Sequence, residues 1–442
     1  MQYPFTTPLL RAALASTLIA LPALAGTAPD WVAPAEPGVE YTSVASDRRG
    51  NAFVAGREVR AGGASALYVA SFDASGARRW SARVEGGTFT TPAGAAAVET
   101  DSSGDLYVTG AASAEGGAPG FAVLKYSGAT GRLLWQTAVT PLANGGATAG
   151  GLGTSLALSG SRTVVAAGYV VRNDAPYGAV AALDSRSGKL RWEWLSGSGE
   201  IRGVATDRRG DVAVTGVRLL AAKLNGKNGR ERWRVEQTSP RTAALGAPVI
   251  RTVAMDRSGN VTVGGSLRKP YEDSLAFYVA QLQSKNGKIR WEFSGPAQPS
   301  FETPAEVAVS SNGQVYACGR YESSPVSMQL RASNGRVTWL RRPWEDDARA
   351  DISVAVTDLA VDKKHVYLCG SDASQVFRVV VLSSAGRELL RVDLGRGEAR
   401  ALAPAPNGRL FVVGSVLDPD TGAMQAALVR VSVPAASAGR RR

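Results

Sequence analysis

The chain has 442 residues, of which 44% are hydrophobic and 20% charged, with 50 glycines, 2 cysteines and a single histidine. This composition excludes a disulfide-stapled scaffold, a disordered chain, a collagen and any metal site built on histidines. With 50 basic and 38 acidic residues the formal net charge is +12, which favours anionic partners such as acidic polysaccharide or membrane headgroups. No stripe of alternating aromatic and basic residues is present, so we expect no nucleic-acid partner.

The first 25 residues have the pattern of a signal peptide. A positive charge at Arg11 precedes an apolar run from Ala12 to Leu21, and a small-x-small cleavage pattern ends at Ala25. The run is shorter than the roughly 20 apolar residues that a membrane span needs, and no later segment reaches that length. We therefore expect a periplasmic or extracellular protein. A lipoprotein anchor is not expected, because no cysteine stands near the cleavage site.

One pattern then recurs eight times: an apolar strand, a turn, a strand that ends in glycine, a variable stretch, another strand, a glycine turn and a tryptophan. Clear copies read VATDRRGDVAVTG, VAMDRSGNVTVGG and VETDSSGDLYVTG. The strand-ending glycines are Gly56, Gly110, Gly168, Gly216, Gly265, Gly319, Gly370 and Gly414. A period near 50 residues with four short strands per copy is typical of a β-propeller. We predict an all-β, eight-bladed β-propeller of four-stranded blades over residues 27–433, followed by a disordered basic tail over 434–442.

The tryptophan of each copy follows a glycine by four residues. The tryptophans of the first six copies are Trp80, Trp135, Trp192, Trp233, Trp291 and Trp339. The glycine supplies the positive φ of a hairpin turn, and the tryptophan begins the outer strand, where its ring is expected to pack between blades. Copy seven has Leu390 instead, and copy eight ends at Val433 without a fourth strand.

The fourth strand of copy eight is expected at the other end of the chain. Trp31 precedes Asp47 of the first copy by nearly the same interval as Trp192 precedes Asp207. Trp31 thus has the register of an outer-strand tryptophan without a blade of its own. We predict that the N- and C-terminal strands pair and close the ring, which removes exposed strand edges. The alternative is an unattached N-terminal arm.

The segment ALDSRSGKLRW, from Ala182 to Trp192, resembles the tryptophan-docking motif A-x-D-x-x-x-G-x-x-x-W of pyrroloquinoline-quinone (PQQ)-like propeller repeats. The D-x-x-G-N-x-x-V-x-G portion also resembles bacterial repeats of the SBBP type. Other copies depart from the motif, with Ser127 and Gln283 in place of the aspartate. The resemblance implies a propeller, but the matching residues are structural and imply no cofactor.

Two kinds of relative suggest different functions. Quinoprotein dehydrogenases of this broad family hold PQQ and calcium, often beneath a disulfide between adjacent cysteines. The two cysteines of this chain are not adjacent and no residue matches a cofactor pocket, so no cofactor is predicted. The propeller subunit of the outer-membrane β-barrel assembly machine, by contrast, is a scaffold. That relative is usually a lipoprotein, and this chain lacks the lipid-bearing cysteine.

Variable connections are expected to share one face of the propeller, where binding residues normally lie. We predict three binding segments there. They contribute Arg172, Asp174 and Tyr177; Arg268, Lys269 and Tyr271; and Arg341, Trp344, Glu345, Asp346 and Asp347. The ring of Trp344 would stack on a peptide or sugar while the carboxylates accept hydrogen bonds. The alternative is a solvated, self-paired loop.

Cys318 and Cys369 stand one residue before the strand-ending glycine of neighbouring copies. Equivalent side chains in successive blades lie about 10 Å apart, too far for a disulfide, so we predict two free buried thiols. His365 is predicted to be an exposed turn residue.

We therefore expect an exported, monomeric, non-enzymatic propeller that binds an envelope or extracellular protein through its variable-loop face. The alternatives are an enzyme, such as a PQQ-dependent quinoprotein dehydrogenase, and a carbohydrate-binding propeller that takes an anionic glycan. No residue is predicted to be catalytic or to bind a metal.

Overall fold

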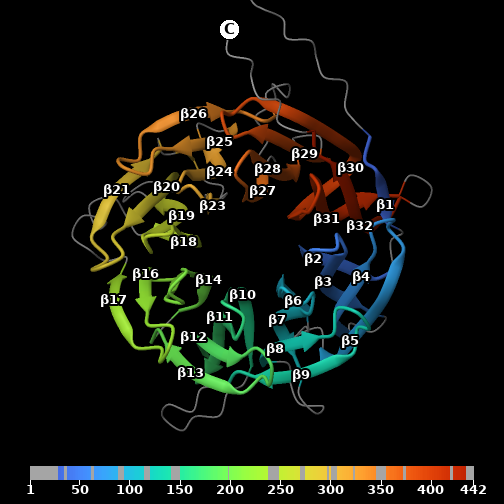
Figure 1. Cartoon of the computed structure of the whole chain (residues 1–442), viewed down its shortest axis with the longest axis horizontal. Coiled ribbons are helices and arrows are strands. Elements are labelled where there is room, and N and C mark those ends of the chain that lie inside the picture. The colour runs from blue at the N-terminus through green and yellow to red at the C-terminus, as the bar shows by residue number, and fades with distance from the viewer. Residues whose placement is uncertain are drawn as a thin grey trace, which may run out of the picture.

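The computed structural model describes residues 28–33, 37–60, 64–87, 94–113, 120–140, 150–197, 199–236, 248–268, 274–295, 298–299, 306–321, 324–344, 355–371, 375–418 and 422–434. Every regular element in these ranges is a β-strand. The strands form antiparallel sheets arranged around a ring, with β2, β6, β10, β14, β18, β23 and β27 nearest its centre (Figure 1). Among the described residues no helix is long and apolar enough to cross a membrane.

Six of the sheets follow the chain in simple order, innermost strand first. The first three contain β2 (Val39–Ser46), β3 (Ala52–Val59), β4 (Ser65–Phe72) and β5 (Arg78–Gly87); β6 (Gly94–Thr100), β7 (Leu106–Ala112), β8 (Gly120–Tyr126) and β9 (Leu133–Ala138); and β10 (Gly151–Ser159), β11 (Thr163–Arg172), β12 (Ala175–Asp184) and β13 (Leu190–Leu195). The next three contain β14 (Ile201–Thr206), β15 (Val212–Gly216), β16 (Leu219–Leu224) and β17 (Glu231–Glu236); β18 (Pro248–Met255), β19 (Val261–Arg268), β20 (Ser274–Leu282) and β21 (Ile289–Ser294), with β22 (Gln298–Pro299) beside β20; and β23 (Glu306–Val309), β24 (Val315–Tyr321), β25 (Ser324–Leu330) and β26 (Val337–Arg341).

The last sheet has seven strands and joins both ends of the described chain. Its order is β1-β32-β31-β30-β29-β28-β27. These strands are β27 (Ala355–Val361), β28 (His365–Ser371), β29 (Val376–Ser383), β30 (Glu388–Ala405), β31 (Arg409–Leu417), β32 (Met424–Ser432) and β1 (Trp31–Ala33). The 18-residue β30 pairs through its first half with β29 and through its second half with β31. It therefore joins two four-stranded units, the second of which ends in β1.

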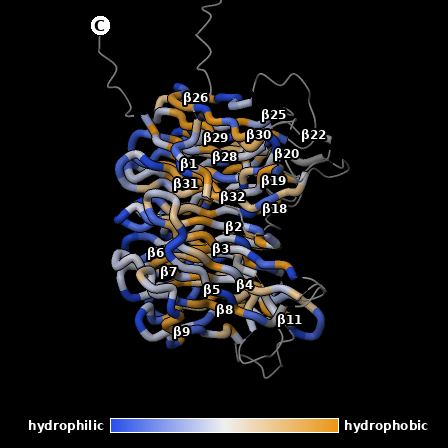
Figure 2. The backbone as a smooth tube through the Cα atoms, turned by 90° about the vertical axis from the view of Figure 1, so that its right-hand side faces the viewer, coloured by the Kyte–Doolittle hydropathy of each residue, from blue (hydrophilic) through white to orange (hydrophobic). Residues whose placement is uncertain are grey.

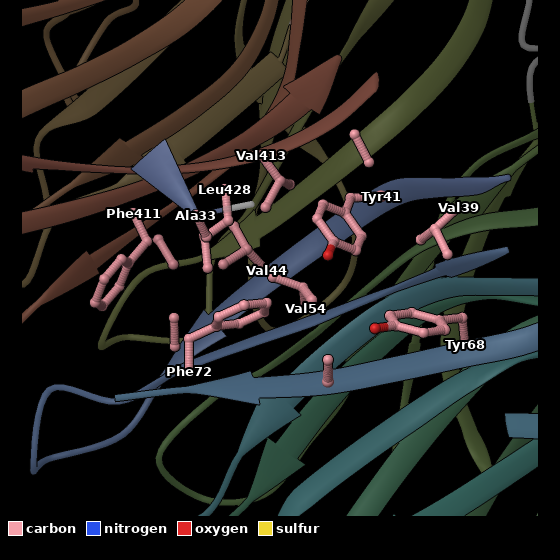
Figure 3. Packing of buried hydrophobic residues seen from close by; sticks show 14 residues of the cluster. Ala33, Val39, Tyr41, Val44, Val54, Tyr68, Phe72, Phe411, Val413 and Leu428 are labelled. Carbon is pink, nitrogen blue, oxygen red and sulfur yellow. The ribbon is translucent and has the colours of Figure 1, made fainter. Parts of the chain in front are cut away.

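The N-terminal strand β1 is held by the C-terminal strand β32. Trp31 pairs with Arg430 and Ala33 with Leu428, in an antiparallel register. Figure 3 shows Ala33 beside Leu428, Val413 and Phe411, in a cluster that also takes in Tyr41 and Phe72. The two ends of the described chain thus share one hydrophobic core.

The middle strands of each sheet form this core. All residues of β4 and of β16 are buried, and both strands consist mainly of Val, Leu, Ala and aromatic side chains. Strands covered on both faces read as continuous apolar runs in this way. The innermost strands are different, because β10 and β14 remain partly exposed. Solvent therefore reaches the side of the sheets that faces the ring axis.

The strand-ending glycine allows a bulge in the neighbouring inner strand. The register of β2 against β3 shifts between Tyr41 and Ser43. A Cβ on Gly56, which faces this bulge, would lie only 1.8 Å from the Glu40 carbonyl oxygen. Only glycine permits such a close backbone approach. The recurring glycine in the sequence is thus explained by a recurring bulge.

Seven tryptophans each bridge two neighbouring sheets. The indole Nε1 of Trp192 donates to the Gly226 carbonyl at 2.9 Å, and that of Trp233 donates to the Ser284 carbonyl at 3.0 Å. Equivalent bonds are made by Trp31, Trp80, Trp135, Trp291 and Trp339. Each ring also lies against the hairpin glycine of the next sheet, as Trp31 does against Gly76. Trp31 thus makes the contact of an outer-strand tryptophan, onto the sheet β2–β5.

Leu390 lacks this contact for a topological reason. The sheet unit that follows it has β32 and β1 as its third and fourth strands, which come from opposite ends of the chain. No hairpin joins them, so no hairpin glycine is available to receive a tryptophan ring. Leu390 instead packs in a core cluster with Val392 and Val431.

Candidate binding faces and the ring axis

The ring has two faces of different construction. Because all strand pairs are antiparallel, the turn between the first and second strands of a sheet lies at the same end as the turn between the third and fourth. We call this end the turn face and the opposite end, which carries the remaining connections, the loop face. In the side view of Figure 2 the turn face lies on the left.

The first predicted segment is a tight hairpin and not an extended loop. Arg172 pairs directly with Ala175, and the two residues between them, Asn173 and Asp174, have φ values of +46° and +58°. This is the geometry of a two-residue type I′ turn. Asp174 is exposed at the tip on the loop face, whereas Arg172 is buried and Tyr177 is half-buried in β12.

The second and third predicted segments are only partly described. Arg268 ends β19, while Lys269, Tyr271, Glu345, Asp346 and Asp347 lie outside the described residues. Arg341 ends β26, and its Nε donates to the Gly386 carbonyl at 2.7 Å, which ties it to the neighbouring hairpin. The structure therefore places the side chains of only part of the predicted set, namely Arg172, Asp174, Tyr177, Arg341 and Trp344.

Trp344 is placed differently from the sequence prediction. Its side chain is only 3% exposed and packs with Tyr316, Val356 and Leu359 in a hydrophobic cluster. Burying this large apolar ring against the neighbouring sheet is more favourable than leaving it in water, even though the residues next to it in the sequence are charged. The prediction that this ring stacks on a ligand is therefore wrong for this structure.

Two aromatic sites on the loop face were missed by sequence reasoning. Near the end of β13, the half-buried Trp194 lies under the guanidinium of Arg234, 5.1 Å from the ring centroid. Between two other sheets, half-buried Phe293 of β21 stacks on Tyr321 of β24, with ring centroids 6.0 Å apart. The signal available in the sequence was an aromatic residue at the loop-face end of a strand. Such residues pack partly against the core and leave a ring edge or face in solvent.

Carboxyl groups from neighbouring inner strands lie close together beside the axis. Asp358 of β27 accepts hydrogen bonds from the backbone N–H groups of Leu359, at 2.7 Å, and of Leu402 on the next sheet unit, at 2.8 Å. At equivalent positions Ser155 and Thr252 accept the same bond from the next sheet through neutral hydroxyls. Asp358 thus puts a titratable group into a contact that hydroxyls make elsewhere.

Glu306 of β23 is the second group of this pair. Burial and the negative charge of Asp358 raise the pKa of Glu306 to about 8, although Arg251 acts in the opposite direction. Burial raises the pKa of Asp358 to about 6, less far because the two N–H donors stabilise its carboxylate. Desolvation by the surrounding strands likewise raises the pKa of Glu99 on β6 to about 7.

The two cysteines are buried free thiols, as predicted. They lie on β24 and β28, opposite Glu306 and Asp358 in the strand register, and burial raises the pKa of both. A thiol with a raised pKa is a poor nucleophile. In the described residues no group of three or more His, Cys, Asp or Glu side chains is placed to hold a metal ion.

His365 is buried, contrary to the exposed turn residue predicted from the sequence. It begins β28, and its Nδ1 lies 3.2 Å from Asp362 Oδ2. The turn is one residue shorter than in the first sheet, so His365 occupies the position of Asn51, which bonds Asp47 in the same way.

An open polar cavity of about 270 Å³ lies on the turn face between the turns that begin at Asp47 and Asp101.

A ring of antiparallel four-stranded sheets with tryptophans bridging successive sheets defines a β-propeller of the PQQ-like repeat class. A family model described as outer membrane protein assembly factor BamB matches residues 30–193 and 119–379, and the chain belongs to this family. No curated protein matches the chain.

Solved structures share the fold at low sequence identity. BamB from Moraxella catarrhalis superposes with a TM-score of 0.54 at 12% identity, covering 91% of this chain and 99% of that chain. Sqt1 from Chaetomium thermophilum, solved bound to the N-terminus of ribosomal protein L10, gives 0.60 at 12% identity over 89% and 97%. The computationally designed protein Ika8 gives 0.55 at 15% identity over 92% and 100%.

Proposed function

We propose that this protein is a non-enzymatic propeller scaffold that binds a partner protein through its loop face. The observation that carries the proposal is the pair of half-buried aromatic sites there, Trp194 with Arg234 and Phe293 with Tyr321. Tyr, Trp and Arg dominate the binding energy of protein interfaces, because large rigid rings bury area at little entropic cost. Membership in the BamB family supports a role in outer membrane protein assembly.

We infer that the scaffold is an eight-bladed ring, closed by its two ends. Six sheets supply one blade each, and the seven-stranded sheet supplies two through the two halves of β30. The pairing of β1 with β32 supports closure, as does the contact of Trp31 with the hairpin at Gly76. On this proposal the propeller runs over residues 27–433 and has no free strand edge between first and last blade.

We propose that the protein is exported, acts in the cell envelope as a monomer, and loses residues 1–25 as a signal peptide. Family membership supports the envelope location. Intact-mass analysis of the protein from its native cell should give a chain that begins at Gly26. A chain that retains Met1 would contradict export by this route.

Partner binding is tested by affinity capture from native membranes. Replacing Trp194 and Tyr321 with serine should abolish capture of the envelope protein that the unmodified chain retains. The matched control replaces exposed turn-face residues Arg186 and Lys227 with serine and should leave capture unchanged. Both variants must unfold cooperatively at a temperature well above that of the assay, which shows that they are folded when capture is measured. If the Trp194/Tyr321 variant captured as much of the partner as the unmodified chain, binding through the loop face would be contradicted.

The rival functions are tested on the purified protein. The comparisons do not favour a PQQ-dependent dehydrogenase. Titration with PQQ and calcium should therefore give neither saturable binding nor dye-linked oxidation of alcohols or sugars. Saturable binding with turnover would make the protein a quinoprotein, and specific retention on an acidic glycan array would favour the carbohydrate-binding alternative.

A further inference from the structure

The turn face collects most of the basic excess of the chain. Its turns between first and second strands are residues 47–51, 101–105, 160–162, 207–211, 256–260, 310–314, 362–364 and 406–408. Its turns between third and fourth strands are residues 73–77, 127–132, 184–189, 225–230, 283–288, 331–336 and 383–387, where the strand-end residues Asp184 and Ser383 are counted with the turns that their N–H groups close. Together these turns contain 18 Lys and Arg against 9 Asp, a net charge of +9, while the whole chain carries +12. Charges that are spread along the sequence are thus brought to one face by the repeat.

The acidic residues of these turns are occupied by the turn backbone. Oδ1 of Asp47 accepts the N–H groups of Arg49 and Asn51, both at 2.9 Å. Asp101, Asp207 and Asp256 make the equivalent pairs of bonds. These carboxylates point back into their own turns, because an aspartate at the first position stabilises the turn in this way.

The basic residues of the turns point into solvent. All 18 are exposed: Arg48, Arg49, Arg132, Arg162, Arg186, Lys189, Arg208, Arg209, Lys227, Arg230, Arg257, Lys285, Lys288, Arg331, Arg336, Lys363, Lys364 and Arg387. Leaving Arg387 aside, none of them makes an ion pair in the part of the chain that the structure describes. Their charge is therefore not neutralised within the molecule.

Six of these residues recur at one turn position, Arg387 among them, and the other five lie in successive sheets. We call Arg132, Lys189, Arg230, Lys288 and Arg336 the rim residues. Each directly follows the hairpin glycine that receives a tryptophan ring, and each backbone carbonyl accepts a hydrogen bond from the first residue of its turn. The hairpins that carry them join the third strand to the outermost strand of five successive sheets, so the rim residues are arranged along the outer part of the turn face (Figure 1).

We propose that the turn face docks on an anionic lipid bilayer, through electrostatic attraction to phospholipid headgroups. The exposed cations occupy both the inner and the outer turns of successive sheets, so they spread over a disc and do not line a groove. A planar surface of many negative charges can contact such an array at once, whereas a peptide or a single polysaccharide chain would meet only part of it. Juxtamembrane basic residues add to membrane affinity one by one, which favours a large array. The inference is independent of the loop-face partner.

Vesicle flotation of the full mature chain tests this proposal. The probes are phosphatidylcholine vesicles and vesicles with about 30% phosphatidylglycerol, at about 50 mM and about 500 mM salt. Replacing the five rim residues with alanine reproduces Ala77, which stands at this position in the hairpin of the first sheet. The turn chemistry is therefore preserved, and thermal unfolding checks that the fold is too.

Two control variants test whether vesicle binding depends on the turn face itself, on the total net charge or on the C-terminal tail. The first removes the same number of positive charges from strands and connections toward the loop face, by replacing Arg57, Arg60, Arg83, Arg202 and Arg396 with alanine. Surface ion pairs such as that of Arg60 with Glu85 contribute little to stability, so this variant should fold. The second lacks residues 435–442, which end in three arginines.

The proposal predicts flotation with anionic vesicles at low salt only. The rim variant should bind at least about tenfold more weakly, because it loses five charges near the membrane surface. The loop-face control should bind within about twofold of the unmodified chain, and the chain without residues 435–442 should bind more tightly than the rim variant because it loses fewer charges. Equal binding by the rim variant, equal loss in the loop-face control, flotation with neutral vesicles, or retention by soluble dextran sulfate without flotation would each overturn the proposal.

Discussion

Gly287 combines the two constraints that fix the recurring hairpin glycine. Its φ is +69°, and a Cβ there would lie 2.7 Å from the ring of Trp233. Gly422 has the same φ of +69°, but a Cβ there would have no other atom within 4 Å. Alanine at position 422 therefore measures only the cost of the positive φ. We expect Gly422→Ala to lower the free energy of unfolding by about 1 kcal/mol. Gly287→Ala should lower it by about 3 kcal/mol, because the ring must move as well.

Urea unfolding of the two variants measures this difference. Equal losses would show that the ring of Trp233 yields freely and does not fix the hairpin. Adding Trp233→Phe to Gly287→Ala should recover part of the loss, since the smaller ring makes room for the methyl group.

Glu306 is expected to make stability depend on pH. Its pKa is raised from an ordinary 4.5 to about 8 in the folded state, so the folded protein binds the proton more tightly than the unfolded chain. The contribution of Glu306 to the free energy of unfolding should therefore be fully present below about pH 4.5 and be lost as the pH rises through about 8. Glu306→Gln removes this dependence and should stabilise the protein at pH 8 by about 1 kcal/mol, with little effect at pH 5.

Thermal unfolding between pH 5 and pH 9 checks the Glu306 prediction. Glu398→Gln is the matched control in the inner half of β30, where the exposed carboxylate makes only a surface ion pair with Arg400, and its curve should run close to that of the unmodified protein. Parallel curves for Glu306→Gln and the unmodified protein would contradict the account.

At the scale of the element, β1 is a three-residue strand whose energetic role rests on Trp31. The ring packs over Gly76 and 6.0 Å from the Phe411 ring centroid, and Nε1 bonds the Ala74 carbonyl. Trp31→Ala should cost about 3 kcal/mol of unfolding free energy. Val32→Ala, at a neighbouring site that is 47% exposed, should cost less than about 0.5 kcal/mol. Similar thermal stability of the two variants would mean that β1 does not hold the ends together.

The elements could be predicted from the sequence because each copy repeats the same local rules. Two features recur in the copies: a hairpin glycine followed by a tryptophan, and a glycine opposite a bulge. Each makes its contacts within one sheet or between adjacent sheets, so the repeated copies all predict the same four-stranded unit. Leu390 and Trp31 even marked the position where the chain ends meet. Contacts that break the repeat were not predictable in this way. Trp344 is buried by a cluster specific to two sheets, and His365 by a turn shortened by one residue.

The candidate sites could be predicted only in part for the same reason. Asp174, one of the predicted binding residues, is exposed at a hairpin tip on the loop face, and its role in binding stays a prediction. Tyr321 and Trp194 were not singled out, because an aromatic residue near a strand end has no sequence feature that separates half-burial from full burial. The basic turn face was also missed, since its charges are scattered in the sequence and gather only when the turns come to one end of the ring.

At the scale of the whole molecule, the fold separates two kinds of surface. Short turns present unpaired cations on one face, and the loop face presents aromatic side chains at strand ends. A scaffold with this division could lie against a membrane with one face and hold a protein with the other. The rigid, fully buried middle strands keep the two faces at a fixed separation.

The most direct test of the scaffold proposal is photo-crosslinking in the native cell from two positions of one sheet. A photoreactive amino acid replaces Asp174, exposed on the loop face, or Ser187, exposed on the turn face of the same sheet. We predict a crosslinked envelope protein from position 174 and none from position 187. A protein crosslinked from position 187 alone, or from neither position, would contradict binding through the loop face.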